Sequence, residues 1–171
     1  DMFKVACLDR DGVINKNNLN NGYIGKIKDF KLLPGSLKAI VYLKSLNFKV
    51  VLVSNQSGVA RGFFKISDVN KLHKYLQDLL KKKDCKLDKI LFCPFHKDGK
   101  VKKYKKISIL RKPNNGMFKI INSKWKVDKK KSFMIGDQYT DMLFAKKSGI
   151  KGFMFKEKNL LKFIKSKKFI K

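Results

Sequence analysis

A short apolar run, Phe3 to Leu8, ends abruptly in two carboxylates, Asp9 and Asp11, followed by Gly12. A run of this length predicts a strand that is buried on both faces of a parallel sheet. Open α/β sheets build their sites at the carboxyl ends of such strands, where the two carboxylates would lie. Because close carboxylates repel each other unless a cation lies between them, the pattern predicts a metal site.

The same pair of carboxylates has chemistry suited to phosphoryl transfer. A carboxylate in the place of Asp9 can attack phosphorus, and one in the place of Asp11 can exchange protons with the leaving and attacking oxygens. For this motif taken alone, a strand end followed by an ordinary solvated turn is the alternative.

Strand and helix patterns alternate along the rest of the chain. Short apolar runs predict strands at Val50–Val53, Ile90–Cys93, Ser132–Ile135 and Gly152–Phe155. Apolar residues at helical spacing predict helices at Leu37–Leu46, Ile66–Leu80, Asn115–Trp125 and Tyr139–Lys147, with a basic helix at Asn159–Ile170. This alternation predicts an α/β fold, a three-layer sandwich around a doubly wound, Rossmann-like parallel sheet.

We expect residues 1–171 to form a single domain, because a hydrophobic content of 43% is enough for a full core at this length. The chain has no insertion large enough to be a cap domain. Either Ser67 or Asp68 is expected near the start of the helix at 66–80, and Gly149 is expected to end the helix at 139–147. Pro94 to Lys112 is the one long irregular segment that we expect, and such loops are usually functional.

The sequence also bears on where the protein resides. No apolar run approaches the ~20 residues that a membrane-spanning helix needs, and the chain does not start with a signal-peptide pattern. Three cysteines, Cys7, Cys85 and Cys93, are an odd number without the spacing of a disulfide framework. We therefore expect a cytoplasmic protein with no membrane partner.

The formal net charge of +29 would by itself suggest a nucleic-acid partner. Only three of the 42 basic residues are arginine, however, and the lysines are spread along the whole chain. Proteins that read phosphate geometry and base edges favour the forked guanidinium of arginine. We therefore expect a solvated, lysine-rich surface rather than a nucleic-acid interface.

Two further segments carry groups that can hold a phosphate. Ser54 and Asn55 follow the second predicted strand and begin a stretch with two glycines, which suits a cradle of side-chain and backbone donors. Arg111 and Lys112 precede Pro113 and can place two cations beside a phosphoryl group. An ordinary turn with a helix cap is the alternative for the first segment.

The fourth predicted strand is also followed by carboxylates. Gly136-Asp137 comes directly after the strand, and Asp141 lies four residues further along. Asp137 can complete an oxygen shell for Mg²⁺. Asp141 can instead cap or orient the loop.

The ordered set D-x-D-G, a strand-end serine, a lysine and an acidic G-D motif resembles the haloacid dehalogenase superfamily of phosphotransferases. More narrowly, LDRDGVIN, SNQSGVARG, RKP-x-x-GM and GD-x-x-x-D-M resemble the D-glycero-D-manno-heptose 1,7-bisphosphate phosphatase family. The related histidinol-phosphate phosphatases share much of this pattern. The likeness runs from about Phe3 to Phe155.

The resemblance implies a Mg²⁺-dependent phosphatase that works through an aspartyl-phosphate. Asp9 would be the nucleophile and Asp11 the general acid and base. Magnesium would be held by the side chains of Asp9 and Asp137 and by the backbone carbonyl of Asp11. The family's members usually have no large cap domain, and we expect a monomer that acts on a small phosphorylated sugar.

The resemblance also implies a binding site for the phosphoryl group. Ser54 and Lys112 would bind it, and Asn55 and Arg111 would assist. The loops at 15–28 and 94–112 would then determine which substrate is chosen.

The chain departs from its relatives in the long loop. Typical relatives bind a structural zinc there through C-x-H and C-x-C, where this chain has Cys93-Pro94-Phe95 and Ser108-Ile109-Leu110. Cys93 and His96 cannot close a tetrahedral zinc site without two more ligands, so we predict no zinc. We expect the polar run from 97 to 106 to lie in solvent, and the loop to be mobile or held by apolar contacts from Phe92, Phe95, Ile107, Ile109 and Leu110.

The sequence leaves two alternative functions open. One is a histidinol-phosphate phosphatase or another small phosphomonoester hydrolase. The other is a basic nucleic-acid-binding module, or a nucleic-acid 3′-phosphatase on the same fold, whose DNA binding would weaken steeply with salt.

Overall fold

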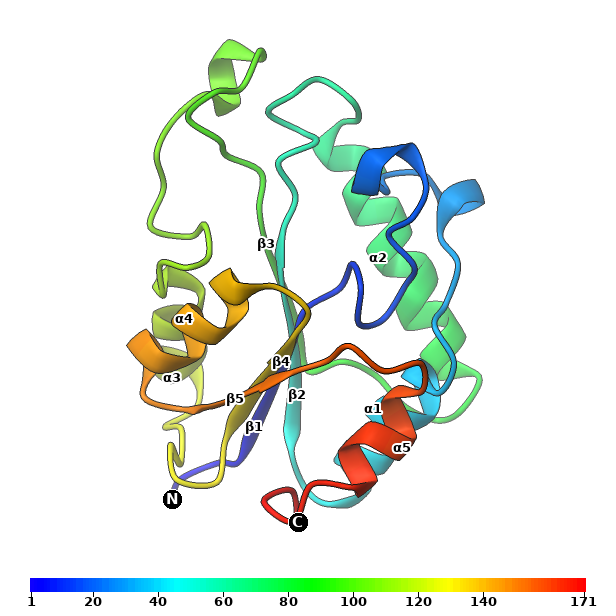
Figure 1. Ribbon diagram of the computed structural model, residues 1–171, viewed down its shortest axis with the longest axis vertical. Coiled ribbons are helices and arrows are strands. Elements are labelled where there is room, and N and C mark those ends of the chain that lie inside the picture. The colour runs from blue at the N-terminus through cyan, green and yellow to red at the C-terminus, as the bar shows by residue number, and fades with distance from the viewer.

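The computed structural model describes all 171 residues, and its centre is a five-stranded parallel sheet (Figure 1). The strands are β1 (Val5–Leu8), β2 (Lys49–Asn55), β3 (Lys89–Cys93), β4 (Phe133–Gly136) and β5 (Lys151–Met154). Their spatial order is β3-β2-β1-β4-β5, so the chain changes direction between β1 and β4. In sheets of this kind the crevice for a ligand opens where that change occurs. The predicted doubly wound sheet is confirmed.

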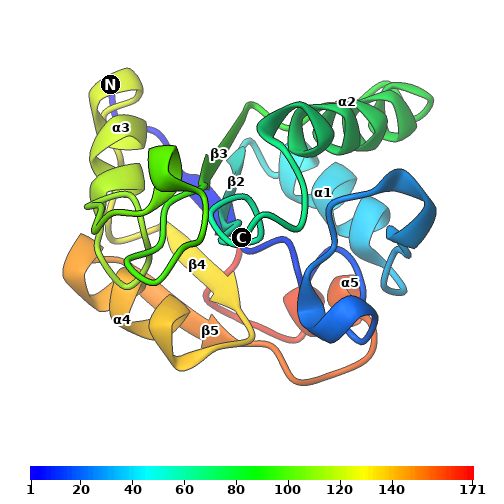
Figure 2. The same ribbon diagram turned by 90° about the horizontal axis from the view of Figure 1, so that it is seen from above.

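Helices cover both faces of the sheet (Figures 1 and 2). They are α1 (Ser36–Ser45), α2 (Ile66–Lys81), α3 (Gly116–Lys124), α4 (Tyr139–Ser148) and α5 (Leu160–Lys165). Helices α1, α2 and α5 lie on one face, while α3 and α4 lie on the other. No cap domain stands over the sheet. This is the three-layer sandwich that the alternating sequence pattern predicts.

The continuous apolar runs are explained by burial on both faces. In β1, Ala6 and Leu8 pack into the core beneath α1, α2 and α5, whereas Val5 and Cys7 pack into the core beneath α3 and α4. Successive side chains of a strand point to opposite faces, so a strand covered on both sides must be apolar throughout.

The helix boundaries match the sequence patterns except at the carboxyl-terminal end. In the first turn of α2 the Asp68 carboxylate accepts a hydrogen bond from the backbone N–H of Lys65 at 2.9 Å. Gly149 ends α4 in the left-handed conformation, at φ 74°. The helix predicted up to Ile170 is wrong in length, because α5 ends at Lys165. Beyond it the chain turns so that Ile170 is only 6% exposed and joins the core.

Two long irregular segments, rather than the predicted one, leave the carboxyl edge of the sheet. The segment between β3 and α3 was expected and contains only the short 3-10 turn Lys102–Tyr104. The segment between β1 and α1 is longer than the loop expected at 15–28 and contains the 3-10 turns Asn20–Gly22 and Ile27–Asp29. Separately, none of the helices is both long and apolar enough to cross a membrane.

Candidate active site

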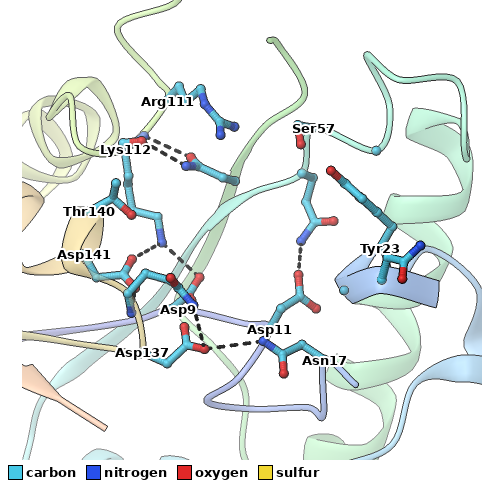
Figure 3. Close-up of a pocket in the computed structure, with 16 residues that line it drawn as sticks. Asp9, Asp11, Asn17, Tyr23, Ser57, Arg111, Lys112, Asp137, Thr140 and Asp141 are labelled. Atoms are coloured by element: carbon cyan, nitrogen blue, oxygen red, sulfur yellow. Dashed lines mark hydrogen bonds and ion pairs between the residues drawn. The ribbon is translucent and has the colours of Figure 1, made fainter. Parts of the chain in front are cut away.

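A polar cavity of about 370 Å³ opens at the carboxyl ends of β1, β2 and β4 (Figure 3). Sixteen residues line it, and only one of them is hydrophobic. The lining includes Asp9, Asp11, Lys112 and Asp137. The structure therefore brings together side chains that the sequence places more than a hundred residues apart.

Lys112 lies between two carboxylates on the floor of the cavity. Its Nζ donates to Asp9 Oδ1 at 2.9 Å, to Asp141 Oδ1 at 2.7 Å and to the carbonyl of Val53 at 2.8 Å. All three donor positions of the ammonium are thus used. Burial disfavours the ammonium, but the Asp9 and Asp141 carboxylates raise the pKa of Lys112 above its ordinary value. Lys112 is therefore a fixed cation.

Two glycines let the carboxylates approach the strand ends. Gly12 has φ +88°, and a Cβ there would lie 2.0 Å from Asp137 Oδ2. A Cβ on Gly136 would lie 2.2 Å from the side chain of Asp141. Any larger residue at either position would displace a carboxylate, so both glycines are needed for the geometry of the site.

The carboxylates fit a divalent cation. Ligand oxygens of Asp9, Asp137 and Asp141 lie within 4.8 Å of one another, and Asp137 Oδ1 is buried without a hydrogen-bond partner. Burial, together with nearby carboxylates, raises the pKa of Asp137 and, more strongly, of Asp9. A cation would reverse this effect, since it stabilises the ionised form.

Asp141 is not free to act as a ligand in the same way. Its Oδ1 accepts from Lys112, and its Oδ2 accepts from the backbone N–H of Gln138 at 3.1 Å. Asp141 therefore caps α4, as one sequence alternative had it, and it also orients Lys112, which the sequence did not predict. The oxygens best placed for a cation are those of Asp9 and Asp137.

Asp11 stands opposite this cluster and is held by donors on both of its oxygens. Asp11 Oδ1 accepts from Arg10 Nη2 at 2.9 Å and from Asn15 Nδ2 at 2.9 Å. Asp11 Oδ2 accepts from Gln56 Nε2 at 2.8 Å. Sequence reasoning missed Asn15 and Gln56 as parts of the site. Their positions gave a signal, because Asn15 ends the LDRDGVIN motif and Gln56 lies within SNQSGVARG.

Ser54 and Asn55, at the end of β2, have different places relative to the cavity. Ser54 is 1% exposed and is not among the lining residues, and its Oγ accepts from Gln56 Nε2 at 2.7 Å. Asn55 lines the cavity, and its amide forms two hydrogen bonds with the backbone of Lys112, at 2.9 and 3.0 Å. Asn55 therefore fixes the segment that carries Lys112.

Arg111 lies at the upper rim of the cavity in Figure 3. Its Nη1 is buried and has no hydrogen-bond partner, and no carboxylate forms an ion pair with it. Burial lowers the pKa of Arg111, and the Arg61 guanidinium contributes to the shift. An unpaired guanidinium facing a polar cavity is suited to an anionic ligand. Most of the remaining lining is neutral and polar and includes Asn17, Asn21, Tyr23, Ser57, Gln138 and Thr140.

The long loop between β3 and α3 is held by the expected apolar contacts of Phe92, Phe95 and Leu110 and also by polar contacts. Ile107 and Ile109 are 80% and 68% exposed, so the predicted apolar contacts from these two residues are wrong. The backbone N–H groups of Lys100 and Val101 instead donate to the carbonyl of Ala60 at 2.7 and 2.9 Å.

Side chains reinforce the same loop. Arg61 Nη2 lies 3.3 Å from His96 Nε2, and the Phe95 and Tyr104 rings pack with centroids 6.1 Å apart. Leu110 packs against the core beneath α3 and α4, and the lysines between 97 and 106 are exposed, both as predicted. Apart from the aspartate cluster, no three Cys, His, Asp or Glu side chains gather as metal ligands. The absence of zinc stays a prediction.

Comparison with known proteins places this site in context. The family profile described as "Polynucleotide kinase 3 phosphatase" matches residues 4–163. The D-glycero-beta-D-manno-heptose-1,7-bisphosphate 7-phosphatase of Rhodopseudomonas palustris is 39% identical over 94% of this chain and 87% of the relative. The protein of the same name from Pasteurella multocida is 37% identical over 88% of this chain and 79% of the relative.

A solved structure agrees with the sequence relatives. The D,D-heptose 1,7-bisphosphate phosphatase from B. bronchiseptica, complexed with magnesium and phosphate, is 30% identical with a TM-score of 0.79. The match covers 97% of this chain and 88% of that structure. The relative therefore holds a magnesium ion and a phosphate on the same fold.

Proposed function

This chain belongs to the haloacid dehalogenase-type phosphatases related to D-glycero-D-manno-heptose 1,7-bisphosphate phosphatase, and from that premise we propose its substrate and site residues. The substrate is D-glycero-D-manno-heptose 1,7-bisphosphate, from which the 7-phosphate is hydrolysed with Mg²⁺ as the cofactor. The observation that carries the proposal is the contact of Lys112 with Asp9, beside the unpartnered Oδ1 of Asp137, on the floor of a polar cavity.

Asp9 is the proposed nucleophile. Its carboxylate attacks the phosphorus in line with the sugar oxygen, so that the bond from Asp9 to phosphorus forms as the bond to the sugar breaks. Asp11 gives a proton to the departing sugar oxygen. Water then attacks the aspartyl-phosphate and gives a proton back to Asp11, which releases phosphate and restores the Asp9 carboxylate and the protonated form of Asp11.

Magnesium would be held by the side chains of Asp9 and Asp137 and by the backbone carbonyl of Asp11. When bound, it supplies positive charge for the phosphoryl oxygens and offsets the repulsion among the carboxylates. Lys112 supplies the second fixed cation, because Asp141 and Asn55 hold its side chain and its backbone in place. A preorganised cation of this kind stabilises the charge that develops in the transition state.

Ser54, Asn55 and Arg111 complete the proposed phosphoryl-binding and substrate-binding set. The Ser54 hydroxyl already accepts a hydrogen bond from Gln56, so its own hydrogen is available for a phosphoryl oxygen. The unpaired guanidinium of Arg111 suits a negatively charged substrate, and the neutral polar lining suits a leaving group rich in hydroxyls.

We also propose that residues 1–171 act as one monomeric domain in the cytoplasm. Support for that location comes from Cys7, Cys85 and Cys93, all of which are free thiols. Thiols in this state suit a reducing compartment.

A second candidate activity is supported by the family profile, whose description refers to a 3′-phosphatase of polynucleotides. The net charge of +29 is compatible with such a substrate. The spread of lysines along the chain and the scarcity of arginine favour the sugar phosphate. Histidinol phosphate remains the alternative among small substrates.

A substrate panel with Mg²⁺ tests the proposal. It should include both anomers of heptose 1,7-bisphosphate, histidinol phosphate and a DNA oligonucleotide with a 3′-phosphate. We expect the highest kcat/KM for a heptose bisphosphate, unaffected by added DNA. Preferential hydrolysis of the oligonucleotide, with steep salt dependence, would replace the proposed substrate by a nucleic acid.

A further inference from the structure

Arg10 lies inside the DRDG motif and is completely buried, at 0% exposure. A buried guanidinium is costly unless its donors are paired. The side chain finds three partners: the Asp11 carboxylate, the His73 ring and the backbone carbonyl of Ile24. Asp11 is the one carboxylate among them, so the buried cation is directed at the residue proposed to move protons.

His73 holds the far side of the guanidinium. Its Nε2 lies 3.1 Å from Arg10 Nη1, and its ring packs edge-on against Phe92 with centroids 5.6 Å apart. Because a guanidinium has only donors, Nε2 must be the nitrogen without hydrogen. His73, which is 5% exposed on α2, is therefore a neutral acceptor that fixes the plane of the Arg10 side chain.

The two oxygens of Asp11 are left in unequal surroundings. Asp11 Oδ1 accepts from Arg10 Nε at 3.2 Å, from Arg10 Nη2 at 2.9 Å and from Asn15 Nδ2 at 2.9 Å. Asp11 Oδ2 accepts only from Gln56 Nε2, at 2.8 Å. Donors therefore crowd Oδ1, which leaves no room there for a proton, while Oδ2 keeps a free lone pair.

We propose that Arg10 and His73 are positioning residues that hold Asp11 so that Oδ2 is its proton-transfer atom. This inference rests on the proposed function. Asp11 Oδ2 gives its proton to the sugar oxygen as the bond from that oxygen to phosphorus breaks. The same Oδ2 takes a proton from water as the water oxygen bonds to phosphorus and the bond from Asp9 to phosphorus breaks.

A leaving-group comparison distinguishes positioning of the general acid from simple support of the fold. p-Nitrophenolate departs readily without a proton, whereas a sugar or glycerol alkoxide needs one. The value of kcat/KM reports the steps up to formation of the aspartyl-phosphate and excludes its hydrolysis, which is common to all substrates. A misplaced acid therefore lowers kcat/KM of alkyl phosphates much more than that of p-nitrophenyl phosphate. Loss of fold slows all of them equally.

The test uses His73→Leu, which removes the acceptor, and His73→Gln, whose amide oxygen can still accept from Arg10. The substrates are heptose 1,7-bisphosphate, glycerol 3-phosphate and p-nitrophenyl phosphate. We expect kcat/KM of His73→Leu on the alkyl phosphates to fall about 10- to 100-fold, the size of effect that misplacement of a group by about 1 Å can have. On p-nitrophenyl phosphate the fall should be less than about threefold, and His73→Gln should restore most of the loss.

Arg10→Lys is a second variant in case His73→Leu does not fold. A single ammonium cannot bond to Asp11 twice and also reach His73, so the same selective loss is expected. Leu76→Val is the matched control, because Leu76 is a buried α2 residue without a polar contact to Arg10. It should leave the ratio of alkyl to p-nitrophenyl turnover unchanged.

Equal losses of kcat/KM on all substrates in the His73 and Arg10 variants, or no loss in either, would overturn the inference. Failure of the wild type to hydrolyse any of the three phosphates would overturn the proposed function, and this inference with it. Hydrolysis of glycerol 3-phosphate but not of heptose 1,7-bisphosphate would overturn only the proposed sugar.

Discussion

Lys112 Nζ and Asp141 Oδ1 form a buried ion pair at 2.7 Å, in which neither side chain is more than 3% exposed. The same ammonium contacts Asp9 at 2.9 Å, so Asp141 decides where the cation stands relative to the proposed nucleophile. A buried pair of this kind depends on both partners, because removing one leaves an uncompensated charge. The role of Asp141 is accordingly to position the Lys112 ammonium rather than to bind the metal.

Asp141→Asn tests this role. We expect kcat to fall about 10- to 100-fold, because a small displacement of Lys112 is enough to weaken its contact with the phosphoryl group. The dissociation constant for Mg²⁺, measured by calorimetry, should change little. Asp137→Asn is the control and should weaken Mg²⁺ binding strongly. If Asp141→Asn weakened Mg²⁺ binding as much and excess Mg²⁺ restored kcat, Asp141 would be a metal ligand instead.

Asp9→Asn should abolish turnover, because an amide neither attacks phosphorus nor binds Mg²⁺ as a carboxylate does. Phosphate release from heptose 1,7-bisphosphate measures the effect, and thermal denaturation checks that the variant is folded. Substantial activity in a folded Asp9→Asn protein would exclude the covalent mechanism.

His73 should make stability depend on pH. Burial, with a contribution from Arg10, lowers the pKa of His73 from 6.5 to about 3. The unfolded ring therefore takes up a proton below about pH 6.5, while the folded ring stays neutral. The free energy of unfolding therefore does not depend on the protonation of His73 above about pH 6.5. It decreases as the pH falls from there toward 3, by up to about 1.4 kcal/mol per pH unit.

Urea unfolding of the wild type and of His73→Gln between pH 7.5 and 5 measures this effect. The midpoint of the wild type should fall more steeply with decreasing pH than that of the variant. Parallel curves would show that His73 is not held neutral in the folded protein.

The long loop should hold its place without zinc. Elemental analysis of protein purified without chelator should give less than one zinc per chain. Treatment with EDTA followed by Mg²⁺ should restore full activity, since the loop is held without metal by hydrogen bonds to Ala60, by the Arg61–His96 contact and by the packing of Leu110 against the core. One tightly bound zinc per chain, with irreversible unfolding on chelation, would contradict this account.

Much of the fold is predictable because its signals are local. Buried parallel strands are continuous apolar runs, and β1 and β4 are each followed directly by a carboxylate of the site, Asp9 and Asp137. The carboxyl-terminal helix was overestimated because lysines favour a helix wherever apolar spacing continues. Packing of Ile170 against the core, which no local pattern reveals, ends the helical path earlier.

The charged residues of the site could be predicted from the sequence, but the hydrogen bonds that hold them in place could not. Asp9 and Asp137 follow strands directly, so topology brings them together, whereas Lys112 reaches them from the end of the long loop between β3 and α3. The hydrogen bonds of Arg10, Asn15 and Gln56 to Asp11 join separate segments, and only the folded chain defines them. All three arginines lie around this site in a chain otherwise rich in lysine. Arg10 and Arg61 each use the fork of the guanidinium to contact two or more groups.

Rapid-quench trapping of the covalent intermediate tests the central claim most directly. Heptose 1,7-bisphosphate labelled at the 7-phosphate is mixed with Mg²⁺ and with wild type or Asp11→Asn, which lacks the base for hydrolysis and should be about 10²- to 10⁴-fold slower. The account predicts acid-stable label on the peptide that contains Asp9, more persistent in Asp11→Asn than in the wild type. Phosphate release without labelled protein, or label on a peptide that lacks Asp9, would contradict it.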